Sequence, residues 1–174
     1  MNNIYVVFQL SDKINELVDK INELLLENNK VIFLGEHLDL FENIYTIKGL
    51  YEKYPNQIVV LKGEQEQEFI ETVKGNNKEL EVLQKYVTFK ELKDINKRFK
   101  KDKDKIKMLL MILHYQHDEL LLWLEQLETS YQVDDYIFAS RLVSNDTNSH
   151  ITYQSYTSNS KELIIMDVKN YNFI

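Results

Sequence analysis

Three short apolar runs, separated by two amphipathic stretches, constrain the fold of this chain most strongly. The runs are rich in β-branched and aromatic residues, which predicts buried strands, and they lie at residues 4–8, 31–34 and 58–61. Apolar residues recur at helical spacing from Ile14 to Leu25 and from Ile44 to Tyr54, and Pro55 stops the second stretch. Alternation of strands and helices in this order predicts a parallel sheet.

The middle of the chain changes character. Residues 64–74, 79–86, 89–99 and 105–128 are typical of helices. Residues 135–139, 151–154 and 163–168 return to strand character. We therefore expect one α/β domain spanning residues 1–174, with a helical insertion at about residues 64–130 after the third strand.

Charge and composition narrow the function classes. The net charge of −7 argues against a general nucleic-acid binder. The chain has no cysteine, its N-terminus has no basic segment followed by an apolar run, and its longest apolar stretch, residues 108–113, is too short for a bilayer. We expect a cytoplasmic protein without membrane contact. One basic run, residues 97–107, is either a solvated face or a docking patch for an acidic partner.

Ligands of such sheets bind outside the carboxyl ends of the strands. The loops that begin at Gln9, Gly35, Gly63 and Ser140, together with the region of His150, are therefore the candidate site.

These segments, taken in order, resemble the motifs of the calcineurin-like metallophosphoesterases, within them the small bacterial serine/threonine and diadenosine-tetraphosphate phosphatases. That family arranges GDxHG, GDxxDRG, GNHE, a helical stretch, HAG and GHT, each motif after a strand. The corresponding segments here are FQLSD at 8–12, GEHLDLF at 35–41, GEQE at 63–66, SRL at 140–142 and SHI at 149–151. The resemblance covers nearly the whole chain. It implies a metallophosphoesterase-like α/β sandwich, somewhat trimmed, with the helical insertion.

The resemblance also implies that most metal-binding side chains have changed type. The family's chemistry uses two metal ions bridged by a carboxylate, and a histidine acid. The changed positions are Gln9 for the first Asp, Ser11 for its His, Glu36 for the bridging Asp, Glu64 for the Asn, Gln65 for the acid His and Ser140 for the HAG His. Leu40 stands in place of the phosphate-binding Arg, His150 keeps its type, and Asp39 and Glu66 are retained supporting residues.

We therefore expect a catalytically inactive metallophosphoesterase-like protein that acts through a protein partner and needs no cofactor. One alternative is a divergent phosphoesterase that holds a single Mn²⁺ or Mg²⁺ through Glu36, Glu64 and His150. Another is a protein that binds a phosphorylated ligand or a nucleotide without cleaving it, against which the missing Arg and the acidic loops count. Outside these loops, His114 and His117 lie one helical turn apart, a spacing found in zinc sites and, more often, on solvated helix surfaces. We expect His37 to be a packing or loop residue.

Overall fold

The computed structural model describes residues 3–9, 14–38, 41–76, 79–133, 136–140, 150–152, 164–167 and 172–173. The chain divides into two compact units. The first combines Met1–Glu66 with Leu127–Ile174, and the second is Gln67–Gln126. In the described part of the chain, none of the helices has both the length and the apolar character needed to cross a bilayer.

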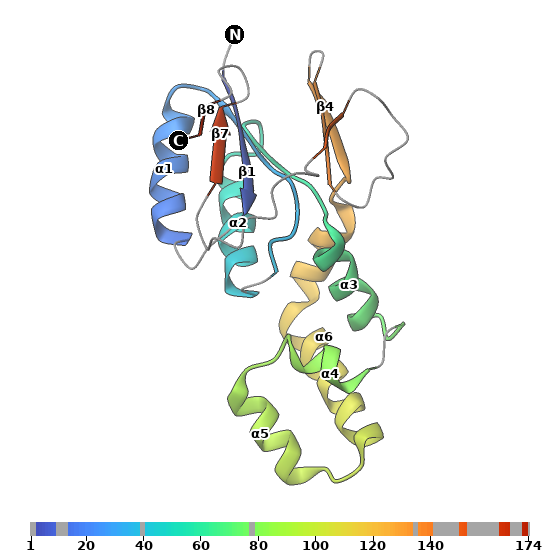
Figure 1. Ribbon diagram of the computed structural model, residues 1–174. Helices are drawn as coiled ribbons and strands as arrows, with labels where there is room; N and C mark the ends of the chain where they lie inside the picture. The colour runs from blue at the N-terminus through green and yellow to red at the C-terminus, as the bar shows by residue number, and fades with distance from the viewer. Residues whose placement is uncertain are drawn as a thin grey trace. The chain divides into compact units, whose positions relative to one another are not determined.

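The first unit contains a five-stranded sheet in the order β3-β2-β1-β7-β8 (Figure 1). Its strands are β1 (Ile4–Gln9), β2 (Lys30–Phe33), β3 (Ile58–Val60), β7 (Ile164–Asp167) and β8 (Asn172–Phe173). Strands β1, β2 and β3 pair in parallel, whereas β7 is antiparallel to both β1 and β8. The mixed α/β class and the parallel strands predicted from the apolar runs are confirmed.

Helices α1 (Ile14–Leu26) and α2 (Phe41–Lys53) form the two crossovers. Helix α1 contacts β2, and α2 contacts β3. Each helix ends just before a residue that cannot continue it. Asn28, in the left-handed region with φ 60°, follows α1, and Pro55 follows α2. Ile21, Ile44 and Ile47 are fully buried, so the helices cover the sheet with their apolar faces.

A second sheet in the first unit has the order β4-β5-β6. Its strands are β4 (Ser130–Val133), β5 (Tyr136–Ala139) and β6 (His150–Thr152), with β4 antiparallel and β6 parallel to β5. The two sheets share a core in which Phe138 of β5 packs with residues of the larger sheet, namely Ile4, Val6, Ile32, Leu34 and Leu61. Strands β4 and β8 were not predicted from the sequence.

The second unit is helical, with α4 (Leu80–Gln84), α5 (Phe89–Arg98) and α6 (Asp102–Gln126) following α3 (Glu64–Val73), which begins in the first unit. A capping box between Thr88 and Glu91 starts α5. Helix α6 begins three residues earlier than predicted and contains a kink at His117. Leu83 and Leu109 are fully buried in this unit, and Phe69 packs edge-on against Tyr86 at 4.9 Å.

Candidate functional site: a carboxylate clamp between two loops

The loops after β2 and β3 meet at one carboxylate, that of Glu66. Its Oε2 accepts hydrogen bonds from the backbone N–H of Gly63, at 2.8 Å, and of Glu36, at 3.0 Å. Its Oε1 accepts the N–H of His37 at 2.7 Å. The side chain is fully buried. Two of these charge-assisted bonds, from Glu36 and His37, join the two loops, while the bond from Gly63 fixes the carboxylate within its own loop. We call this arrangement the Glu66 clamp.

Two glycines allow the loops to approach this closely. Gly35 has φ +101°, and a Cβ built on it would lie 2.8 Å from both the Cα and the N of Gly63. A Cβ on Gly63 would lie 2.6 Å from the N and from Oε1 of Glu36, and 2.8 Å from Oε2 of Glu66. Both positions therefore exclude any larger residue unless the clamp opens.

Two neighbouring side chains add further bonds between the same loops. Glu36, which has φ 63°, accepts the N–H of Glu64 through Oε1 at 2.7 Å. Gln65 accepts the N–H of Leu38 through Oε1 at 3.0 Å. Glu64 is the first residue of α3 and Glu66 the third, so the bonds to Gly63 and Glu64 satisfy N–H groups that a helix start leaves free. Carboxylates are also favoured there by the helix dipole.

His37 is buried beside the clamp. Its Nε2 accepts the N–H of Gly35 at 2.9 Å, and its ring packs edge-on against Phe33 with centroids 5.6 Å apart. Because Nε2 is an acceptor, the proton of the neutral ring sits on Nδ1, which has no partner among the described residues. Burial lowers the pKa of His37 to about 3. The ring is therefore neutral at physiological pH, in line with the packing role expected for it.

Burial also governs Glu66. It raises the pKa of the Glu66 carboxyl, while the N–H groups of His37, Gly63 and Glu36 and its own backbone N–H pull in the opposite direction. A carboxylate offers about four lone-pair sites. Three backbone N–H groups therefore occupy most of the acceptor capacity of this side chain.

The structure brings three of the predicted site residues together, Glu36, Glu64 and Gln65. Two of them bond the backbone of the opposite loop, and the carboxylate of Glu64 is exposed. Ser140, directly after β5, is buried; its N–H donates to the carbonyl of Thr129 at 2.9 Å, and its Oγ has no partner among the described residues.

Four predicted site residues remain: Gln9, Ser11, Asp39 and His150. Gln9 is the last residue of β1 and His150 the first of β6, and the structure describes only their backbones. Ser11 and Asp39 lie outside the described residues. Within the described ranges, no three His, Asp or Glu side chains are grouped as ligands for one metal ion.

The sequence reasoning missed the central role of Glu66 and the need for Gly35 and Gly63. The sequence did contain a signal for Glu66. It lies three residues after Gly63, which precedes α3, and a glutamate at this position forms half of a capping box. In the helical unit, His114 is exposed and His117 sits at the kink, where burial lowers its pKa.

No family model matches the chain, and no curated protein or solved structure matches it either.

Proposed function

We propose that this chain is a metallophosphoesterase-like protein that no longer hydrolyses phosphoesters and acts by binding another protein. One observation carries the proposal: two of the three acidic side chains at the centre of the site, Glu36 and Glu66, accept hydrogen bonds from backbone N–H groups. Glu66 accepts three backbone N–H groups from two loops, and Glu36 accepts a fourth. These two carboxylates therefore stabilise the loops.

The order of the elements supports the descent. Motif-like segments at Gly35 and Gly63 follow parallel strands β2 and β3, and Ser140 follows β5 in a sheet that shares a core with the first. Two-metal hydrolysis needs ligands that bridge and orient both ions. On the proposed alignment, an amide and a hydroxyl, Gln65 and Ser140, stand where that chemistry needs imidazoles.

The test uses the full chain, loaded with Mn²⁺ or Mg²⁺ and then desalted. Bound metal is measured by mass spectrometry, and hydrolysis is assayed with p-nitrophenyl phosphate and with diadenosine tetraphosphate. We expect substoichiometric metal and no turnover above that of a buffer blank. Stoichiometric metal together with turnover would overturn the proposal and favour the divergent phosphoesterase.

Two variants separate genuine turnover from a contaminating phosphatase. Glu36→Gln keeps an oxygen that can accept the N–H of Glu64 while removing the charge that a cation would need. Glu23→Gln makes the same change on the exposed face of α1 and is the matched control. Turnover that falls in Glu36→Gln and persists in Glu23→Gln belongs to this chain.

A further inference from the structure

The helical unit carries a groove that the clamp does not use. It has a volume of about 670 Å³ and lies between the end of α3 and the middle of α6. Its lining is apolar with a basic rim: Val73, Lys74, Gly75, Lys107, Leu110, Met111, His114 and Tyr115. The volume falls in the range of protein ligand sites.

The outer face of α6 extends the groove into a stripe. Lys103, Lys107, Met111 and Tyr115 follow one another at four-residue spacing, so they lie on one face of the helix. All four are exposed; Met111 is 58% accessible and Tyr115 is 91% accessible. Large apolar side chains this exposed, side by side on one face, are typical of surfaces that another molecule covers.

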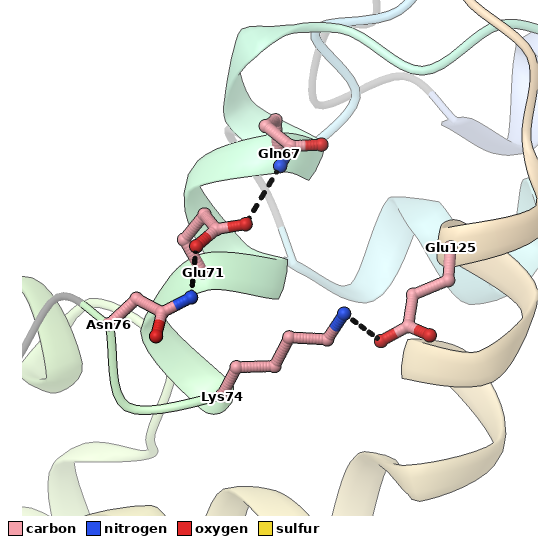
Figure 2. Close-up of polar contacts among 5 residues, drawn as sticks. All are labelled: Gln67, Glu71, Lys74, Asn76 and Glu125. Carbon is pink, nitrogen blue, oxygen red and sulfur yellow. Dashed lines mark hydrogen bonds and ion pairs between the residues drawn. The ribbon is translucent and has the colours of Figure 1, made fainter.

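An ion pair holds the side of the groove that the end of α3 forms. Lys74, just beyond the end of α3, forms an ion pair of 2.9 Å with Glu125 of α6, and Gln67, Glu71 and Asn76 are hydrogen bonded in series along α3 (Figure 2). Lys74 thus lines the groove while its charge is engaged. The cations available to a ligand are those of the α6 stripe.

The charge of the stripe indicates the sign of the ligand. Two of the four stripe residues are lysines, Lys103 and Lys107. They belong to the basic run 97–107, which holds seven of the chain's 21 lysine and arginine residues against two aspartates, although the whole chain carries a net charge of −7. Lys105 is paired with Asp102 at 3.3 Å. In the described part of the chain, Lys103 and Lys107 form no ion pair. Unpaired lysines next to an exposed apolar patch complement acidic residues next to apolar ones.

We infer that this groove binds an acidic segment of another protein, whose apolar side chains cover Met111 and Tyr115 while its Asp or Glu residues meet Lys103 and Lys107. This inference rests on the interaction role proposed above and names the chemistry of the partner. An extended or helical peptide fits better than a small anion, because the apolar and basic halves of the stripe span three helical turns.

The test selects a random peptide library, displayed on phage, against the immobilised full-length protein. Selected peptides are resynthesised with a fluorophore, and their affinity is measured by fluorescence anisotropy. We expect sequences that combine Asp or Glu with Leu, Phe, Ile or Trp. Met111→Glu and Lys107→Glu should each weaken binding by about tenfold or more, because both change the centre of the contact. Lys93→Glu reverses an exposed charge on α5 and should change affinity less than about twofold.

Each other outcome overturns the inference. Peptides without acidic residues, binding insensitive to Met111→Glu and Lys107→Glu, or no enrichment at all would refute it. Tighter binding of a single-stranded oligonucleotide at the same residues would assign the stripe to nucleic acid. Concentration-dependent dimerisation by light scattering that Met111→Glu abolishes would assign it to a second copy of the chain. The metal and hydrolysis assays do not depend on the groove, so failure of either proposal is visible separately.

Discussion

Replacing Glu66 by glutamine tests the clamp with the smallest possible change. The amide keeps the size of the side chain and one oxygen, but its nitrogen cannot accept a hydrogen bond. If the oxygen takes the Oε2 position, it serves Gly63 and Glu36, and the N–H of His37 faces another donor. If it takes the Oε1 position, two donors lose their acceptor. At least one buried N–H is therefore left unsatisfied in either orientation.

The magnitude follows from the number of bonds. A buried donor without a partner costs about 1–3 kcal/mol, and the bonds that survive lose their charge assistance. We expect Glu66→Gln to lower the free energy of unfolding of the first unit by about 2–4 kcal/mol. Glu64→Gln changes the net charge identically at an exposed position in the same helical turn, and should change stability by less than about 0.5 kcal/mol.

The assay must report on the first unit. The chain's single tryptophan, Trp123, lies in the helical unit, so its fluorescence is a poor probe of the clamp. Amide hydrogen exchange by NMR at Gly63, Glu36 and His37 reads the clamp directly. A loss of 2–4 kcal/mol corresponds to exchange faster by about 30-fold to several hundred-fold. Unchanged protection of these amides in Glu66→Gln would refute the reasoning.

Four further predictions concern the surroundings of the clamp, helix α2 and the helical unit. Gly63→Ala should destabilise the first unit by about 2–4 kcal/mol, because its Cβ would meet Glu36 at 2.6 Å. Gly49→Ala, on a helix where a Cβ meets nothing within 4 Å, should stabilise by about 0.5–1 kcal/mol in urea unfolding followed by far-UV circular dichroism. His37 has its pKa lowered to about 3, so its contribution to stability is present above pH 6.5 and is lost as the pH falls toward 3. His37→Gln keeps an acceptor but does not titrate. Between pH 6 and 4, the free energy of unfolding should therefore fall less steeply in the variant than in the unchanged protein. The two slopes should differ by about 1.4 kcal/mol per pH unit, and equal slopes would contradict a buried neutral ring. Thr88→Ala removes the cap of α5 and should cost about 1 kcal/mol, measured by urea unfolding followed through Trp123 fluorescence, whereas Thr88→Ser should cost little.

The three parallel strands of the larger sheet, β1, β2 and β3, could be predicted because most of their residues are buried. Val6, Val31 and Phe33 are fully inaccessible, and such strands appear in the sequence as continuous apolar runs. Strand β4 has no such run. Its residues alternate between exposed and partly buried, and only four of them pair, so their pattern is short and weak.

The position of the candidate site could be predicted from the sequence, but the hydrogen bonds that form it could not. Loops after parallel strands meet at one edge of a sheet, which places residues 35–38 near residues 63–66. Two of the three bonds that define the clamp join residues about 30 positions apart, such as Glu36 and Glu66. They depend on the φ angle of Gly35 and on the residue at which α3 begins. The hydrophobic pattern of a sequence does not define a helix start to within one residue.

The most direct test of the central claim is an NMR titration of the full-length protein with Mn²⁺, whose unpaired electrons broaden the signals of nearby amides. If the carboxylates of Glu36 and Glu66 are committed to backbone N–H groups, an equimolar addition of Mn²⁺ should leave the amides of Glu36, Gly63 and Glu64 as sharp as those elsewhere. Selective broadening of these amides that saturates near one equivalent and disappears in Glu36→Gln would contradict the account.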